Sequence, residues 1–539
     1  MDSFGTLYFR RIIVQVTFYG AVREVTGSMH LIKTESDGIL LDCGMFQGRR
    51  KDTENKNKSF PFDPKSILTL VLSHAHIDHS GRIPLLTKNG FTGRVICTRA
   101  TADACAYLLL DSAHIQESDT NYLNYKSLLN VLLLKSNNSD HNKSKKNRRN
   151  EIANMLKIEG NKLNIEQIKA LMKENHLDRI SPLYTIEEAE RALQCFAGYP
   201  YRVPVEIGLN TTCTFYEAGH ILGSALSLIK IKEKDRWFTV CYTGDIGRYD
   251  KPIIKNPNAL FPEEDSNIDL LIIESTYGNR EHEPISDLKP QLKKVINDTV
   301  KRGGVIIIPA FAYGRTQELL YILHELYDKG ETPKLPVYVD SPLASKITKV
   351  FGEHPEVYSS ETIDTFLSKG ENPFSFEQVN FTSSVDESMT LMRDNTPHIV
   401  ISASGMCEAG RVLHHLRYKA HNPDNTILIV GFMAENTLGR RIQDYGIAYE
   451  ESGRKGEAPV IKILNKEYPL NARVVKLGGF SAHGDKNEML RFLKESNLKI
   501  KRIAVVHGEE EQTLSFTGFL TQAGYSAFAP RPGDTVEIE

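Results

Sequence analysis

Short apolar runs, separated by turns that contain glycine, open the chain and predict strands. Residues 14–19, 29–33 and 38–42 each form such a run, and the third ends in Asp42-Cys43-Gly44. Residues 67–72 (ILTLVL) are almost entirely apolar, which is typical of a short strand buried on both faces. This run leads directly into a polar, histidine-rich stretch, so we expect polar side chains at the end of a buried strand.

The pattern changes in the middle of the chain. Residues from about 100 to 200 are predicted to be mostly helical. A polar and basic run at residues 137–150 (NNSDHNKSKKNRRN) interrupts this stretch, and we expect it to be an exposed loop.

Strands return after residue 210 and later alternate with helices. The predicted strands are residues 212–216, 225–231, 238–242, 270–274, 304–309, 335–339, 398–402, 426–430, 474–477 and 503–506. The predicted helices of the later part are residues 315–327, 486–495 and 512–523. Such alternation is typical of a parallel α/β architecture.

Length and composition place the chain among globular proteins. Its 539 residues suffice for two or more domains, with 40% hydrophobic and 25% charged residues. The formal net charge is only -2, so any contact with a nucleic acid must come from a local basic surface.

The cysteines and the apolar runs indicate the compartment. Seven scattered cysteines include no C-x-x-C pair, which excludes a disulfide framework and a thiolate metal site and favours a reducing, cytoplasmic setting. No apolar run is long enough to span a membrane, and the first residues lack the apolar core of a signal peptide.

The strongest chemical signal is His74-x-His76-x-Asp78-His79, directly after the buried strand. Imidazole nitrogens and carboxylate oxygens suit zinc, and one short loop can direct alternating members toward two adjacent ions. An isolated histidine is more often packed in a core or solvated, but four metal-competent side chains within six residues predict a metal site.

This motif resembles the signature of the metallo-β-lactamase superfamily. Asp42, at the end of an apolar strand, is similar to the first motif of that superfamily. His220, in AGHILGS, is similar to the third motif, and Asp245, in YTGD, to the fourth. Enzymes with this core act on many substrates, so the core alone names none.

Three later segments resemble the β-CASP nuclease branch of the superfamily. Glu274 in ESTYG is similar to motif A, His483 in FSAHGD to motif B and His507 in VVHGEE to motif C. A histidine in motif C is the pattern of RNA-directed members. The resemblance is closest to stand-alone bacterial RNases that are similar to the endonuclease subunit of the cleavage-and-polyadenylation machinery.

The resemblance implies a fold and a domain order. The fold is an αβ/βα metallo-β-lactamase sandwich with an inserted β-CASP α/β domain. Residues 1–277 form the first part of the sandwich, with a helical, basic insert at about 110–195. Residues 278–470 form the β-CASP domain, and residues 471–539 return to the sandwich.

The resemblance also implies two Zn²⁺ ions per chain. One is held by His74, His76 and His220, the other by Asp78, His79 and His507, and Asp245 bridges both. The implied reaction is hydrolysis of phosphodiester bonds in single-stranded RNA by a hydroxide between the metals. Endonucleolytic cutting is expected, and the sequence leaves open whether exonucleolytic cutting accompanies it.

Four side chains are assigned to the chemistry. Asp78 orients or deprotonates the water, and Asp42 holds a metal ligand in place. His483 is the candidate acid for the leaving oxygen, unless it is only structural. Glu274 either fixes the His483 ring or holds the interdomain cleft.

Glycine-flanked polar loops are candidate phosphate sites in the inserted region. The residues concerned are Arg315, Ser404, Gly405, Arg411, Arg440 and Arg441. The alternatives are that Arg315 caps or pairs on its helix, that Ser404 and Gly405 simply form a turn, and that Arg440 and Arg441 form a solvated face. The basic run at 137–150 is either a solvated linker or an RNA-contacting arm, and a homodimer is expected only by resemblance.

Two other functions compete with the ribonuclease. A zinc hydrolase of small esters or thioesters shares the metal core but leaves Glu274, His483 and the inserted domain unexplained. A non-catalytic scaffold for RNA processing usually lacks metal ligands, whereas every matched ligand is present in this chain.

Overall fold

Two seven-stranded sheets pack face to face and form a sandwich. The computed structural model describes residues 14–48, 50–137, 145–160 and 162–538. The first sheet has the order β24 (Thr535–Ile538), β1 (Val14–Gly20), β2 (Met29–Lys33), β3 (Gly38–Leu41), β4 (Thr69–Val71), β5 (Arg94–Thr98) and β8 (Phe196–Tyr199). The second has the order β23 (Ala527–Phe528), β22 (Lys499–Val505), β13 (Asn267–Ile273), β12 (Arg236–Tyr242), β11 (Ala225–Glu233), β10 (Thr211–Glu217) and β9 (Val205–Gly208).

Alternating side chains of the strands separate the layers of the sandwich. Val16 and Ile39 of the first sheet pack with Phe215 and Val240 of the second in one buried cluster. The outer face of the second sheet is covered by α15 (Lys486–Glu495) and α16 (Glu510–Gln522). Helices therefore cover sheets that face each other, and the expected αβ/βα sandwich is confirmed.

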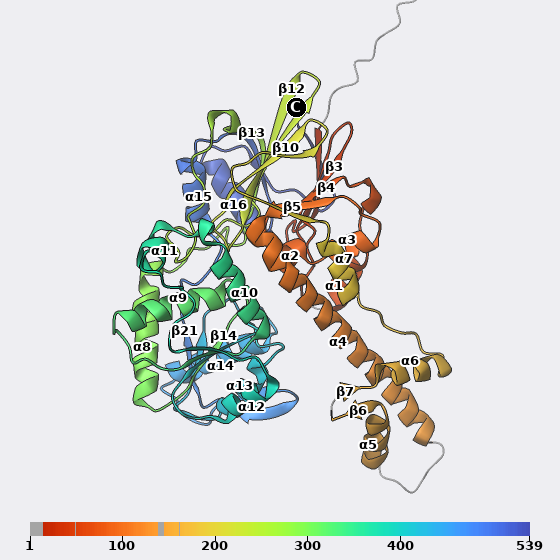
Figure 1. Ribbon diagram of the computed structural model, residues 1–539, viewed down its shortest axis with the longest axis vertical. Coiled ribbons are helices and arrows are strands. Elements are labelled where there is room, and N and C mark those ends of the chain that lie inside the picture. Colours follow the sequence, from red (N-terminus) through yellow and green to blue (C-terminus); the bar gives the residue numbers. More distant parts are fainter. Residues whose placement is uncertain (1–13, 49, 138–144, 161, 539) are drawn as a thin grey trace, which may run out of the picture.

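A six-stranded parallel sheet forms the second large unit. Its order is β16 (Val379–Phe381), β15 (Val337–Val339), β17 (Ile399–Ser402), β14 (Ile306–Pro309), β18 (Thr426–Ile429) and β21 (Arg473–Lys476). One face packs against α8 (Leu288–Lys301), α9 (Arg315–Asp328) and α10 (Pro342–Glu353). The other packs against α12 (Val385–Arg393), α13 (Val412–Lys419) and α14 (Leu438–Glu451), as Figure 1 shows.

The chain passes between the sandwich and the six-stranded unit through loops that connect their sheets. Strand β21 pairs with β18, so residues 473–476 belong to the six-stranded sheet, although we placed the return to the sandwich at residue 471. We propose that the units divide where their sheets do, with the return after Lys476. Strand β24, which no sequence pattern predicted, then pairs with β1 and makes the last strand an edge of the first sheet.

A long helix connects the sandwich to a smaller unit. Helix α4 (Arg99–Asn137) carries α5 (Lys145–Met155), β6 (Lys157–Glu159), β7 (Lys162–Leu163) and α6 (Ile165–Glu174) at its far end. This unit stands apart from both large units in Figure 1, and α7 (Ile186–Leu193) leads the chain back to the sandwich.

The expectation of an exposed loop at residues 137–150 is partly wrong. Residue 137 ends α4 and residues 145–150 belong to α5, whereas residues 138–144 lie outside the described residues. Lysine and arginine are good helix formers, so a basic composition does not by itself exclude a helix. Among the described residues, no helix combines the length and apolar character needed to cross a bilayer.

Candidate metal centre

The candidate ligands follow the carboxyl ends of strands from both sheets. The loop after β4 carries His74 and His76, and the one-turn helix α2 (Ile77–Ser80) carries Asp78 and His79. His220, Asp245 and His507 follow β10, β12 and β22 of the facing sheet. These strand ends meet at one edge of the sandwich, which brings residues that are far apart in sequence together.

Four donor atoms form the first group: Nε2 of His74, Nδ1 of His76, Nε2 of His220 and Oδ2 of Asp245. His76 Nδ1 lies 3.0 Å from His74 Nε2 and 3.3 Å from His220 Nε2. Asp245 Oδ2 lies 3.4 Å and 3.5 Å from those two Nε2 atoms. Ligand atoms about 2.1 Å from a tetrahedral zinc are roughly 3.4 Å apart, so this group fits such an ion.

The second group shares Asp245 with the first. His79 Nε2 lies 2.9 Å from His507 Nε2 and 3.3 Å from Asp245 Oδ1. Asp78 Oδ2 lies 3.8 Å from His507 Nε2. Asp245 Oδ1 is buried without a hydrogen-bond partner among the described residues. A buried carboxylate oxygen without a partner is costly, and a cation at this position would satisfy it.

Asp42 does not join either group but orients one ligand. Its Oδ2 lies 2.6 Å from Nδ1 of His79, which leaves His79 Nε2 directed at the second group. The backbone N–H of Ser73 and the Tyr242 hydroxyl donate to the same carboxylate at 2.7 and 2.6 Å. Burial alone would raise the pKa of Asp42, but the His79 ring and these hydrogen bonds lower it.

Burial keeps the imidazoles of the first group neutral. It lowers the pKa of His74 to about 4 and that of His76 to about 3. Neutral imidazole is the form that binds a metal, so the loop presents these nitrogens ready for coordination.

Glu274 and His483 form a pair beside the first group. His483 Nδ1 lies 3.1 Å from each carboxylate oxygen of Glu274 and 3.8 Å from Asp245 Oδ2. The buried Glu274 is held by the backbone N–H of Ile246 at 2.7 Å. Burial lowers the pKa of His483, but Glu274 and Asp245 raise it to about 9, and the side chain is 21% exposed. The ring thus carries a proton next to the donor groups and faces solvent.

Three charged side chains that sequence reasoning did not place together lie behind the His220 loop. Lys251 donates to the carbonyl oxygen of His220 at 3.1 Å and pairs with Glu318 at 2.8 Å. Glu318 also pairs with Arg315, whose guanidinium lies over the Phe480 ring. Nothing in the local sequence distinguishes Lys251 or Glu318 from solvated surface charges.

Arg315 is therefore placed differently from a phosphate clamp. Its side chain is nearly buried and paired within its own helix, which is the pairing that we kept as an alternative. The structure gives it no open surface toward a polynucleotide, and this placement disfavours the predicted phosphate contact.

The other candidate phosphate residues gather at one end of the six-stranded sheet. Gly439 N–H donates to Met406 O at 3.0 Å and so joins the loop of Ser404 and Gly405 to the start of α14. Arg411 is paired with Asp340 at 2.6 Å, and Arg440 with Asp444 at 2.8 Å. Their predicted role in binding RNA stays a prediction.

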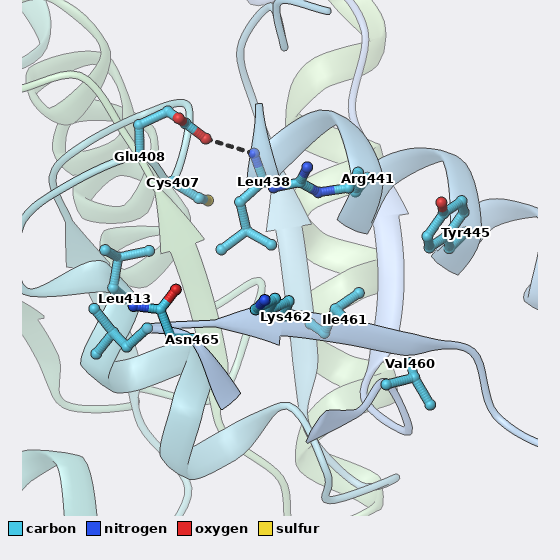
Figure 2. A pocket seen from close by; sticks show the side chains of 11 residues that line it. Cys407, Glu408, Leu413, Leu438, Arg441, Tyr445, Val460, Ile461, Lys462 and Asn465 are labelled. Carbon is cyan, nitrogen blue, oxygen red and sulfur yellow. Dashed lines mark hydrogen bonds between the residues drawn. The ribbon is translucent and has the colours of Figure 1, made fainter. Parts of the chain in front are cut away.

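Arg441 lies in the wall of a hollow that is separate from the metal centre. The hollow has a volume of about 520 Å³ and lies between α14 and the hairpin of β19 (Val460–Ile463) and β20 (Lys466–Pro469). Figure 2 shows Arg441 and Lys462 on its lining, with the Glu408 carboxylate accepting from Leu438 N–H at 2.6 Å. The Glu408 carboxylate thus caps the N-terminus of α14.

The sandwich, the donor set and the inserted parallel sheet define a metal-dependent hydrolase of the metallo-β-lactamase fold. Residues 22–105 match the metallo-beta-lactamase superfamily, residues 316–442 the Beta-Casp domain, and residues 467–530 the Zn-dependent metallo-hydrolase RNA specificity domain. The chain belongs to the β-CASP family of this superfamily.

Bacterial and archaeal proteins are among its relatives. Ribonuclease TTHA0252 of Thermus thermophilus is 31% identical over 526 residues, which cover 97% of this chain and all of that protein. Transcription termination factor FttA of Methanosarcina mazei is 29% identical over 92% of this chain and 67% of its own length. The FttA of Pyrococcus horikoshii is 27% identical over 97% of this chain and 71% of its own length.

Proposed function

We propose that the protein is a zinc-dependent ribonuclease that hydrolyses phosphodiester bonds of single-stranded RNA. The observation that carries the proposal is the pair of donor groups that meet at Asp245, with the Glu274–His483 pair at their side. The ribonuclease among the relatives aligns with nearly the whole chain and supports RNA as the substrate.

We propose two zinc ions, one for each donor group. Five imidazoles and two carboxylates form the donor set, and such nitrogen-rich sets suit zinc better than magnesium or calcium. When bound, the metal pair lowers the pKa of water and neutralises charge on the phosphate.

The residues around the ligands then have separate tasks. Asp78 is 20% exposed, so its carboxylate reaches the solvent side, where it can orient a water molecule and accept its proton. Asp42 keeps His79 in one tautomer and one orientation. His483 is a proton donor to the leaving oxygen, and Glu274 orients its ring through Nδ1, which leaves Nε2 to face the substrate.

The mode of cutting is proposed to be endonucleolytic, with exonucleolytic action in addition. The direct test is cleavage of single-stranded RNA labelled at either end, with and without chelator. Internal fragments that disappear on chelation and return with zinc are expected. A metal-replete, folded protein that leaves RNA intact but hydrolyses small thioesters would overturn the proposal.

The role of His483 has its own test. His483→Ala should lower the cleavage rate by about 10²–10⁴-fold, which is the usual contribution of a general acid, while the metal content stays unchanged. His282→Ala is the control, because His282 contacts the backbone at His483 without reaching the donor groups. Full activity of His483→Ala with normal zinc content would refute the assignment.

A further inference from the structure

The small unit at the end of α4 carries a net positive charge in a chain that is slightly acidic as a whole. Its described residues between 126 and 180 include 11 Lys and Arg but only five Asp and Glu, a net charge of +6. Asp140 and Lys143 lie outside the described residues, and their opposite charges leave this net charge unchanged. Since the whole chain carries -2, the remainder carries -8. An anionic polymer would thus be attracted to this unit more strongly than to the remainder of the chain taken as a whole.

This unit, the distal half of α4 with α5, β6, β7 and α6, is called the helical arm here. Leu128 and Leu156 pack with Ile168 and Met172 and give the arm a core of its own. At its base, Asn124 exchanges two hydrogen bonds with the backbone of Ile180, at 2.8 and 2.9 Å. The arm is therefore an ordered element that projects from the sandwich, as Figure 1 shows.

Aromatic and basic side chains lie together on the arm. The rings of Tyr122 and Tyr125 are 6.2 Å apart, and Tyr122 is 57% exposed. Lys126 is exposed one turn after Tyr122, and Lys146 and Arg149 are exposed one turn apart on α5. Burial raises the pKa of Tyr125, and the charge of Arg149 opposes this rise, which places the guanidinium near that ring.

Basic groups beside exposed aromatic rings are the features that bind single-stranded nucleic acids without sequence preference. The cations pair with phosphates, and every base can stack on an aromatic ring. Charged side chains alone would make this surface soluble, so solubility does not account for the exposed Tyr122 ring among them.

Helix α4 also fixes the arm relative to the metal centre. At its first turn, the Thr98 and Thr101 hydroxyls donate to Gly223 O at 2.7 and 2.9 Å, in the loop that carries His220. Tyr122 lies 23 residues beyond Arg99, or about 35 Å along the helix. At roughly 3.4 Å per stacked nucleotide, a strand of about ten nucleotides spans this distance.

We propose that the helical arm is a second binding site for single-stranded RNA, which holds substrate outside the metal centre. This inference rests on the proposed function and adds a substrate preference: RNAs long enough to reach both sites are bound more tightly. Lys146 and Arg149 contact phosphates, and Tyr122 stacks on a base.

The test compares two RNA lengths in the double variant Lys146→Gln/Arg149→Gln. Affinity for RNAs of 6 and 40 nucleotides is measured in chelator at several salt concentrations, and cleavage of both is measured with zinc. The 40-mer should bind about tenfold more weakly, with a salt slope smaller by about 1.4, because each lost phosphate contact contributes about 0.7. Binding and cleavage of the 6-mer should not change.

The matched control is Lys294→Gln/Lys301→Gln, which removes two exposed helical charges from α8. An equal loss in the control, or an equal loss for both RNA lengths, would overturn the proposal. Tyr122→Ala should weaken 40-mer binding without altering the salt slope. Unchanged 40-mer binding in both arm variants would also overturn it and would point to a protein partner for the exposed Leu134 and Ile158.

Because binding is measured without cleavage, this result is independent of the proposed activity. A protein that cuts no RNA but loses 40-mer affinity in the arm variant would contradict the ribonuclease and retain the arm. A protein that cuts RNA, but binds the 40-mer equally well with and without the arm substitutions, would support the ribonuclease and contradict the arm as a binding site.

Discussion

Asp245 is the side chain on which the two donor groups meet. One of its oxygens lies 3.4–3.5 Å from His74 and His220, and the other lies 3.3 Å from His79. The carboxylate is buried, so no water shell can take the place of a bound cation beside it.

Asp245→Asn should therefore lose zinc from both groups as well as activity. An amide removes the charge between the two positions and replaces one acceptor oxygen by a donor group. Metal analysis of the purified variant should give much less than two zinc ions per chain. Asp119→Asn, on the exposed side of α4, should keep the wild-type stoichiometry, and an unchanged zinc content in Asp245→Asn would contradict a bridging role.

Gly44 is the second residue on which the centre depends. A Cβ atom at this position would lie 1.6 Å from the carbonyl oxygen of Asp78. Because the nearest atoms, which are O and C of Asp78 and N of Ser28, all belong to the backbone, no side-chain rotation relieves the overlap.

Gly44→Ala should displace the loop of Asp78 and His79, with a cost of about 1–3 kcal/mol in folding free energy. Cleavage should fall by more than this loss of stability explains at a temperature where the variant is folded. Rate, zinc content and denaturant midpoint are measured together. Gly518→Ala, where a Cβ atom meets nothing within 4 Å, should leave rate and zinc content unchanged, and it should not lower the denaturant midpoint because alanine favours the helix.

At the scale of elements, α9 connects the six-stranded unit to the metal centre. Tyr313, just before the helix, donates its hydroxyl proton to Leu222 O, and its ring lies 5.6 Å from the His76 ring. Glu318 in the first turn neutralises the buried Lys251 and Arg315. The inserted unit thus supports the loop of His220 from behind.

Glu318→Gln should destabilise the protein by about 3–5 kcal/mol, because it leaves two buried cations without their shared partner. Urea denaturation of the full chain measures the change. The matched control is Glu361→Gln at an exposed position of α11 (Ser360–Thr365), which should shift stability by less than about 0.5 kcal/mol. If Glu318→Gln also changed the free energy of unfolding by less than about 0.5 kcal/mol, Glu318 would not be neutralising two buried cations.

At the scale of the whole molecule, the donor groups lie where the sandwich and the inserted unit come together. Of the second group, only Asp78 is appreciably exposed, at 20%, and His483 is exposed to a similar extent. On the proposed function, the phosphate has to reach donor groups that are largely buried, which we expect of a flexible single strand more than of a stiff duplex.

We expect single-stranded RNA to be cut at least about tenfold faster than a blunt duplex of the same sequence, equivalent to about 1.4 kcal/mol in the activation barrier. Initial rates on the two substrates at equal concentration check this. A duplex with a single-stranded overhang serves as the control and should recover the fast rate. Equally rapid cutting of the blunt duplex would show that the opening is wider than the burial of the ligands indicates.

Much of the fold followed from local patterns. The expected strands at residues 29–33 and 225–231 and the helix at 486–495 agree with the structure to within two residues. Strand β24 was missed because its pairing with β1 joins residues 14–17 to residues 535–538, which no local periodicity reveals. The helix at 145–150 was missed because its basic composition resembles that of a solvated loop.

The sequence by itself determined which side chains are candidates for the metal centre, because each follows a run of apolar residues that must become a buried strand. It did not determine the partners of Arg315, which looks like a free arginine at a helix start and is buried against Phe480 and Glu318. Burial and charge neutralisation depend on contacts between residues far apart in the chain, and so does the anchoring of α4 beside the His220 loop. Only the tertiary structure decides these, because it sets which charges lose water and which remain exposed.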